Sequence, residues 1–360
     1  MAVISAGRRD LDGLAAGLRR WLRVQRPDAM DLRLSPLETN PSSGFSSETV
    51  FFTVAYDRDG AAHEEPLVLR LPPSGGGMFP EYDLARQAAT HALLAGRGIP
   101  APSPTTHEPD PTWIGSEFLL MPRLPGRVPG DYVYMLKGWV KDAEPSWQRR
   151  FYESFADALV RLHQIDLDDL DPTDAALLAR PAGVGLAAEA RWWADYLSWA
   201  TDGSADAEMA AAYRWVDDTV PADPAMALTW GDPRFANAAF DDAGQVVGVL
   251  DWEQAAIGPP ELDVAWWLET RSQSRAALGI AAEAELPGFL DDQATVARVE
   301  AGLGRPLRDL AWHRTFAAIR MGTCVVALQH LLRRSGQADH FLLQAVPLPP
   351  AVVALVDGLA

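Results

Sequence analysis

The stretch from Leu228 to Trp267 constrains the fold more than any other part of the 360-residue sequence. It reads LTWGDPRFANAAFDDAGQVVGVLDWEQAAIGPPELDVAWW. Two short apolar runs, AAF and VVGVLDW, flank the turn sequence DDAGQ, a pattern that predicts a β-hairpin. Asp232 and Asn237 precede the first run, and Asp251 lies at the end of the second. Because both ends of a hairpin return to one place, we expect these three side chains to converge.

The chemistry of these three side chains suits a site for a metal–nucleotide complex. Magnesium prefers oxygen ligands and usually takes one or two from the protein, together with phosphate oxygens and water. Asn237 and Asp251 fit that requirement. Asp232 then remains to accept a proton from, or to orient, an attacking hydroxyl. Turn chemistry is the alternative, since Asp and Asn favour turns, but the whole pattern favours a phosphoryl-transfer site.

The rest of the sequence predicts a small sheet followed by a mainly helical region. Residues 49–60, 66–73 and 117–122 are short strand-like runs, and residues 82–102 read as an Ala- and Leu-rich helix stopped by glycines and prolines. The segment RLPGRVPGD then suggests a hinge. Beyond it, apolar residues recur at helical spacing, as in the face formed by Phe151, Phe155, Leu159 and Leu162.

Composition and charge exclude several classes of protein. A formal net charge of -18 repels phosphate backbones and anionic lipid surfaces, and no basic stripe offsets it, so we expect no nucleic-acid or membrane partner. The single cysteine, Cys324, excludes a disulfide within one chain and fits a reducing cytoplasm. The N-terminus lacks the apolar core of a signal peptide, and no Gly-x-Ser-x-Gly elbow supports a hydrolase. We therefore expect a cytoplasmic protein.

The residues WGDPRFAN and LDWE resemble the catalytic loop and metal loop of the aminoglycoside phosphotransferase family, a choline kinase-like family similar to protein kinases. In that family the pattern is His-Gly-Asp, four residues, Asn, a hairpin and Asp. The resemblance implies that Asp232 is the catalytic base and that Asn237 and Asp251 hold Mg²⁺. It continues through GPPELDVAW, where Asp263 resembles a buried carboxylate that braces the catalytic loop. The sequence also resembles the kinase-like part of acyl-CoA dehydrogenase fusions.

The N-terminal region carries further parts of this resemblance. NPSSGFSSETVFFTV resembles the strand-turn-strand that covers the nucleotide phosphates. Gly44 would let the backbone approach phosphate, and Ser46 and Ser47 would donate hydrogen bonds. PLVLRLPP resembles the strand that carries a phosphate-binding lysine, and it offers Arg70. SEFLLMPRL resembles the linker that receives adenine, near Met121.

The resemblance implies an α+β, protein kinase-like fold of two lobes, with a small N-terminal antiparallel sheet and a larger, mainly helical C-terminal lobe. We expect an amphipathic helix within residues 1–30, the nucleotide-binding lobe at 31–122, and a helical lobe with the catalytic loop, metal loop and substrate pocket at 123–360. ATP is the implied phosphate donor, with GTP as an alternative.

Three residues depart from the family pattern. Trp230 stands where most relatives have His, which removes a polar brace from the catalytic loop. Arg70 replaces lysine, so a planar guanidinium takes the place of a point charge. Gln87 stands where a glutamate usually pairs with that lysine, so the ion pair becomes at most a hydrogen bond. These changes are expected to affect turnover more than nucleotide binding.

Other polar and aromatic residues allow two interpretations each. Arg234 contacts phosphate or substrate, or forms an ion pair, and His163 is expected to be a packing histidine. Four aromatic residues would line a cage for a cationic or acyl substrate or pack in the core, and their helical spacing favours the core. These four are Trp192, Trp193, Tyr196 and Trp199.

The expected function is ATP-dependent phosphorylation of a hydroxyl group on a small molecule. The family name suggests an aminoglycoside, and the acidic charge of the chain is compatible with a cationic acceptor. A hydroxyacyl compound or another metabolic alcohol is the alternative acceptor. A nucleotide-binding pseudokinase with weak catalysis is the alternative function, and the presence of Asp232, Asn237 and Asp251 argues against it. The sequence does not indicate an oligomeric state.

Overall fold

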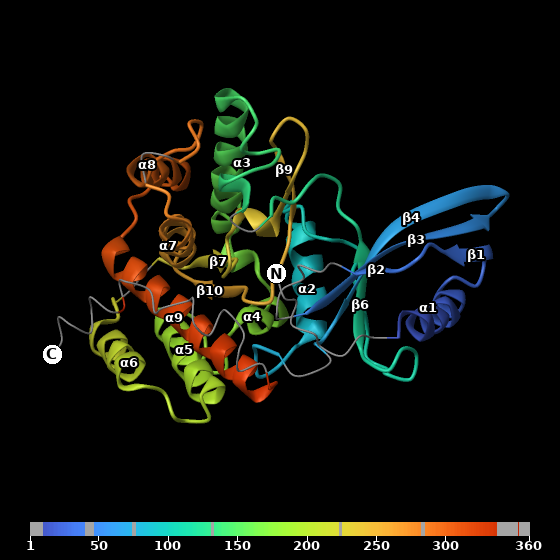
Figure 1. Ribbon diagram of the computed structural model, residues 1–360, viewed down its shortest axis with the longest axis horizontal. Helices are drawn as coiled ribbons and strands as arrows, with labels where there is room; N and C mark the ends of the chain where they lie inside the picture. Colours follow the sequence, from blue (N-terminus) through green and yellow to red (C-terminus); the bar gives the residue numbers. More distant parts are fainter. Residues whose placement is uncertain are drawn as a thin grey trace.

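A sheet-rich lobe and a helical lobe lie side by side, with α2 between them (Figure 1). The structure, a computed structural model, describes residues 10–39, 47–73, 77–130, 133–222, 225–281 and 285–336, together with residue 352. The predicted α+β class, with a small antiparallel sheet and a larger helical part, is confirmed. The boundaries expected near residues 30 and 122 stay a prediction.

The first lobe is built on an antiparallel six-stranded sheet in the order β1-β3-β4-β6-β5, with β2 also paired to β3. Its strands are β1 (Met30–Leu34), β2 (Glu38–Thr39), β3 (Glu48–Arg58), β4 (Ala61–Leu71), β5 (Thr106–Glu108) and β6 (Phe118–Pro122). Asp59 and Gly60 form the turn between β3 and β4 with φ values of 54° and 76°, a left-handed conformation that Asp and Gly favour in tight hairpins. The strands β1, β2 and β5 were not predicted, because short edge strands carry no continuous apolar run.

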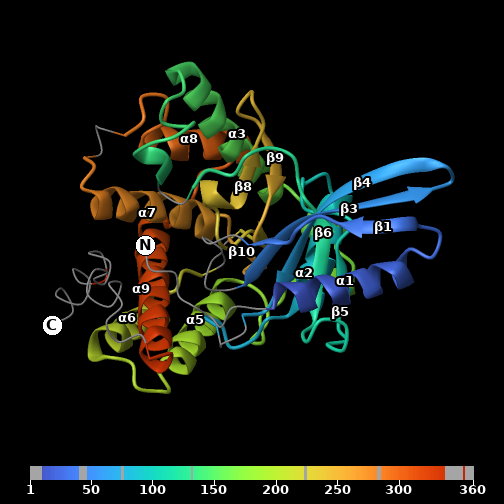
Figure 2. The same cartoon turned by 45° about the vertical axis from the view of Figure 1, so that its right-hand side comes forward.

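Helix α1 (Leu11–Gln25) lies along the sheet (Figure 2). Asp10 caps its first turn, where the carboxylate accepts hydrogen bonds from the N–H groups of Asp12 and Gly13 at 3.1 and 3.0 Å. The helix buries one apolar face in the core of this lobe, against residues such as Val54 and Leu69. The residues of that face are Leu14, Leu18, Trp21 and Leu22.

Replacing Gly17 by Ala is expected to lower the free energy of unfolding by about 1–3 kcal/mol, the usual cost of overpacking. A Cβ atom on Gly17 would lie 2.1 Å from the Trp113 carbonyl oxygen, which belongs to the backbone and moves only with its loop. Urea unfolding of the variant measures this change. Gly96→Ala is the matched control, because a Cβ atom there meets nothing within 4 Å. Equal stability of the two variants would contradict the predicted contact.

Helix α2 (Leu84–Gly96) joins the two lobes. Asp83 caps it through the Arg86 N–H at 2.8 Å. The Arg86 guanidinium then reaches the helical lobe, where it donates to the carbonyl oxygens of Leu177, Glu253 and Ala255. Two of these three carbonyls belong to the segment that follows Asp251, so α2 fixes that segment relative to the sheet.

The second lobe consists of helices around two short antiparallel ladders, β7 with β10 and β8 with β9. Its helices are α3 (Pro145–His163), α4 (Pro172–Leu178), α5 (Leu186–Ala200), α6 (Ala207–Thr219), α7 (Glu261–Leu278), α8 (Asp292–Leu303) and α9 (Leu310–Arg334), and its 3-10 turns are η1 (Val133–Met135), η2 (Leu167–Asp169) and η3 (Phe235–Asn237). Its strands are β7 (Ala227–Thr229), β8 (Ala238–Phe240), β9 (Val246–Val249) and β10 (Ala256–Gly258). The predicted apolar face of α3 is confirmed, because Phe151, Phe155, Leu159 and Leu162 are all buried.

Helix α9 is the one described helix that is long and apolar enough to cross a membrane by length and composition. Just over half of its most apolar window, 56%, is buried inside the molecule, where the helix packs against α5, α6 and α7. The buried Arg320 lies near its middle. These properties match a core helix of the second lobe.

Candidate active site

The β8–β9 hairpin places Asn237 and Asp251 side by side, as the sequence predicts. Ala238 pairs with Val249, and the Leu250 N–H donates to the Asn237 carbonyl oxygen at 2.8 Å. Asp251 follows with a φ of 62°, a left-handed conformation that Asp tolerates better than most residues. The second strand is therefore shorter than predicted, since such a residue cannot continue extended pairing.

Asp232 lies in the loop before η3, and its carboxylate is buried among four hydrogen-bond donors. Arg234 donates to both oxygens at 2.7 Å, Asn237 Nδ2 donates to Oδ2 at 2.9 Å, and Trp266 Nε1 donates to Oδ1 at 2.6 Å. Burial alone raises the pKa of Asp232, but the Arg234 guanidinium and the hydrogen bonds outweigh it, so the pKa lies below its ordinary value. Asp232 is therefore a carboxylate at neutral pH.

Asp263 anchors the backbone just before Asp232. This carboxylate is completely buried and accepts hydrogen bonds from the N–H groups of Trp230 and Gly231 at 2.7 and 2.9 Å. His163 Nε2 lies 2.9 Å from the same carboxylate. The brace implied by the resemblance is thus present as three hydrogen bonds, and His163 takes part in it rather than only packing.

Trp230 makes a polar contact, although its place in the family's His position predicted the loss of one. Its indole Nε1 donates to the Leu250 carbonyl oxygen at 2.8 Å. Leu250 directly precedes Asp251, so the indole connects the loop that contains Asp232 to the end of the β8–β9 hairpin. The prediction that Trp230 removes a polar brace is therefore wrong, because an indole N–H can serve as donor in the place of an imidazole.

Arg70 lies on β4 in the sheet-rich lobe, and its side chain contacts Asp251 at the end of the β8–β9 hairpin. Its guanidinium lies 2.6 Å from the Asp251 carboxylate and 3.1 Å from that of Glu253, and its Nε donates to Ser47 Oγ at 2.8 Å. Burial alone lowers the pKa of Arg70, but Asp251 and Glu253 reverse this, so the pKa lies above its ordinary value. Arg70 is thus a fixed positive charge beside the proposed metal ligand.

Arg70 forms its ion pairs with residues other than the one at position 87. Gln87 is buried in α2, and within the described part of the chain its Oε1 atom has no hydrogen-bond partner. Arg70 instead pairs with two carboxylates that follow β9. The positive charge on β4 therefore keeps a full ion pair.

The other residues predicted for the nucleotide site are Gly44, Ser46 and Met121. Gly44 and Ser46 lie outside the described residues. Met121 is on β6, where it pairs with Val68, two positions from Arg70 on the neighbouring strand. Its proposed contact with adenine stays a prediction.

The sequence pattern that defines the phosphotransferase enzyme family, APH, matches residues 38–296, which is more than half of the chain and includes the whole site described above. The chain belongs to this family. It is accordingly a phosphotransferase that acts on small molecules.

Curated relatives of this APH-family chain include acyl-CoA dehydrogenase family members. Mouse member 10 is 29% identical over 204 residues, which is 56% of this chain and 18% of the relative. Human member 11 is 26% identical over 234 residues, which is 62% of this chain and 29% of the relative. The chain spans less than a third of these longer proteins.

Solved structures show the same fold. A protein of Ralstonia eutropha JMP134, described as a candidate aminoglycoside phosphotransferase, superposes with a TM-score of 0.66 at 18% identity, covering 95% of this chain and 98% of the other. The type I macrolide 2'-phosphotransferase gives a TM-score of 0.54 at 20% identity, covering 96% and 97%. The APH-family chain therefore has the predicted two-lobed, kinase-like fold.

Several residues of the site were not found by sequence reasoning. Glu253 follows Asp251 by two positions and joins the ion pair with Arg70. Trp266 ends the quoted stretch GPPELDVAW on α7, but no role was predicted for it there, and Arg320 comes from α9, outside every quoted motif. The three-residue spacing from Asp263 to Trp266, which places both on one helix face, is the signal that could have pointed to Trp266.

The aromatic residues of α5 divide between core and surface. Trp193 and Tyr196 are buried in the core, as expected from their helical spacing. Trp192 is only partly buried and stacks on Tyr196, while Trp199 is 37% exposed. The Phe79 ring, from the segment between β4 and α2, also stacks on Tyr196, with 5.4 Å between the ring centroids.

The donor atoms at the hairpin end fit magnesium. Asn237 Nδ2 donates to Asp232, so the amide oxygen Oδ1 is the atom left for a metal, and Asp251 adds a carboxylate. Within the described residues, no three His, Cys, Asp or Glu side chains cluster to hold a metal alone. An Asn and an Asp suit an ion that completes its shell with phosphate oxygens and water.

Proposed function

We propose that this chain transfers the γ-phosphoryl group of ATP to a hydroxyl group of a small molecule, with Asp232 as the base. The observation that carries the proposal is the connected group formed by four predicted residues from two lobes. Asp232 contacts Asn237, the end of the β8–β9 hairpin joins Asn237 to Asp251, and Asp251 contacts Arg70. Catalysis by positioning and charge, as phosphoryl transfer requires, needs such a group.

Each residue of this group has one role in the proposal. Asn237 and Asp251 hold magnesium, which neutralises charge on the phosphates when it is bound. Arg70 steadies the phosphates, assisted by the loop that contains Gly44, Ser46 and Ser47. Asp232 accepts the proton of the acceptor hydroxyl, and its low pKa keeps it ionised for that purpose.

ATP is the proposed phosphate donor, and adenine lies near Met121 in this proposal. The solved APH(2")-IIa phosphotransferase forms a ternary complex with ATP and streptomycin and covers 95% of this chain with a TM-score of 0.51. GTP is the alternative donor. Competition between the two nucleotides for binding distinguishes them.

The charges around the site favour a neutral or anionic acceptor over a polycation. Asp232 is paired with Arg234, and Asp251 and Glu253 are paired with Arg70. A polycationic acceptor would meet the guanidinium groups of Arg234 and Arg70, which already hold these carboxylates. The acyl-CoA dehydrogenase relatives support the same choice, a hydroxyacyl compound or another metabolic alcohol.

An aminoglycoside is the second candidate acceptor, supported by the Ralstonia neighbour and by the net charge of -18. A panel of kanamycin, choline and 3-hydroxybutyryl-CoA tests the acceptor class. ADP formation with magnesium and ATP is measured for each compound, with Asp232→Asn as control. Stimulation by the hydroxyacyl ester supports the first class, whereas stimulation by kanamycin alone would replace it with the second.

Replacing Asp251 by Asn is expected to weaken binding of ATP with magnesium by roughly tenfold or more, since a lost charge-assisted contact of about 1.4 kcal/mol has that effect. Binding of ATP without magnesium is expected to stay equal or to strengthen, because a negative charge is removed. Isothermal titration with and without magnesium measures both. The control is Asp242→Asn, whose side chain in the same hairpin is 99% exposed. An unchanged magnesium effect would refute the role of Asp251.

A further inference from the structure

The carboxylate of Asp232 has no room for a further donor in this structure. A carboxylate offers about four lone-pair positions, and Arg234, Trp266 and Asn237 together supply four hydrogen bonds, two to each oxygen. An acceptor hydroxyl must therefore replace one of these donors. Which donors stay determines how the carboxylate is oriented when the hydroxyl arrives.

The donors differ in how firmly they are held. The Arg234 side chain is 23% exposed and belongs to the same loop as Asp232. The indole of Trp266 is 5% exposed and comes from α7, a separate element. Arg234 is the donor that can leave with the least disruption, and Trp266 is the donor that stays.

The Trp266 ring is in cation–π contact with Arg320 of α9. The Arg320 guanidinium is buried against two indoles, 4.5 Å from the centroid of Trp266 and 4.7 Å from that of Trp193. Cation–π contacts of this kind gain strength when they are removed from water. The same guanidinium donates to the Gly231 carbonyl oxygen at 2.9 Å. Arg320 thus holds the ring and the catalytic loop in one relative position.

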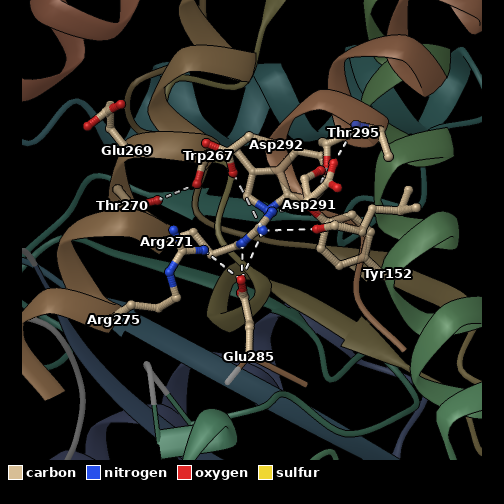
Figure 3. Close-up of polar contacts among 12 residues, drawn as sticks. Tyr152, Trp267, Glu269, Thr270, Arg271, Arg275, Glu285, Asp291, Asp292 and Thr295 are labelled. Atoms are coloured by element: carbon tan, nitrogen blue, oxygen red, sulfur yellow. Dashed lines mark hydrogen bonds and ion pairs between the residues drawn. The ribbon is translucent and has the colours of Figure 1, made fainter. Parts of the chain in front are cut away.

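Helix α7, which carries Trp266, forms a network of polar contacts in its C-terminal half (Figure 3). Arg271 pairs with Glu285 at 2.8 Å, donates to the Leu290 carbonyl oxygen at 2.9 Å, and contacts the Tyr152 hydroxyl on α3. Arg275 pairs with the same glutamate at 2.6 Å. This network ties α7, which also carries Asp263 and Trp266, to Tyr152 of α3 and to the segment before α8.

We propose that Trp266 is a positioning residue, whose indole N–H, held by Arg320, sets the orientation of the Asp232 carboxylate toward the acceptor hydroxyl. The inference rests on the proposed function, since it concerns the base of that reaction. In this proposal α7 supports Asp232 in two ways. Asp263 accepts hydrogen bonds from the backbone just before Asp232, and Trp266, three residues later on the same helix face, donates to the Asp232 side chain.

The test compares Trp266→Phe with Trp267→Phe. Both substitutions shorten a buried tryptophan of α7, but among the described residues Trp267 Nε1 has no hydrogen-bond partner. Using the panel acceptor that is phosphorylated fastest, we expect Trp266→Phe to lower kcat by about 10–100-fold, the usual effect of removing the support of a functional side chain. The KM for ATP is expected to stay the same, and Trp267→Phe is expected to keep the wild-type kcat.

A double-mutant cycle separates positioning from simple loss of structure. In an Asp232→Asn background, Trp266→Phe is expected to cause little further loss, because the two residues act as a unit. All rates are measured at a temperature where circular dichroism shows each variant folded. Wild-type kcat in Trp266→Phe, or an equal loss in both backgrounds, would overturn the inference alone. A wild-type chain that phosphorylates no acceptor would overturn the proposed function together with it.

Discussion

Replacing Asp232 by Asn is expected to lower kcat by about 10²–10⁴-fold, the range that general acid–base catalysis contributes. The amide has nearly the same shape, but it cannot take the proton of the acceptor hydroxyl. Binding of ATP with magnesium is expected to be retained, because Asn237, Asp251 and Arg70 are unchanged. Steady-state transfer rates and nucleotide titrations measure the two effects.

The control for this substitution is Asp242→Asn, which makes the same chemical change at a fully exposed position of the neighbouring hairpin. It is expected to have wild-type activity. Normal activity in Asp232→Asn would show that another group takes the proton.

Replacing Asp263 by Asn is expected to lower the free energy of unfolding by about 3–5 kcal/mol, the cost of breaking a buried polar cluster on one side. The buried carboxylate accepts from Trp230, Gly231 and His163. An amide presents an NH₂ group to one of these donors, so at least one N–H loses its acceptor in a place that water cannot reach. Activity is expected to fall as well, because Gly231 directly precedes Asp232.

Urea unfolding of Asp263→Asn measures the change, and Asp217→Asn, at an exposed position of α6, is the control. The catalytic loop allows little adjustment, since a Cβ atom on Gly231, whose φ is 89°, would lie 2.5 Å from the Gln254 carbonyl oxygen. Stability equal to that of the control would mean that Asp263 does not support the loop.

The parts of the site that are close in sequence could be predicted, and the parts that meet through tertiary packing could not. The turn DDAGQ between two apolar runs was enough to bring Asn237 and Asp251 together. The pairing of Arg70 with Asp251 and Glu253 depends on how two lobes meet, and no local pattern reports that.

Trp266 and Trp267 show this limit most clearly. They are adjacent, identical in type and both buried, yet one donates to Asp232 and the other packs with α3 residues such as Tyr152. Helical periodicity places them on different faces but does not say which face meets the catalytic loop. Trp230 is a related case, because the family pattern predicted a lost polar contact, whereas the indole N–H donates to the Leu250 carbonyl oxygen.

The most direct test of the central claim follows the γ-phosphoryl group itself. The purified chain is incubated with magnesium, γ-labelled ATP and each compound of the panel, and the label is counted in the acceptor, in inorganic phosphate and in ATP. The account predicts label in one acceptor class with the wild-type chain, and its loss with Asp232→Asn. Tight binding of ATP with no label in any acceptor or in phosphate would contradict it and would identify the chain as a nucleotide-binding pseudokinase.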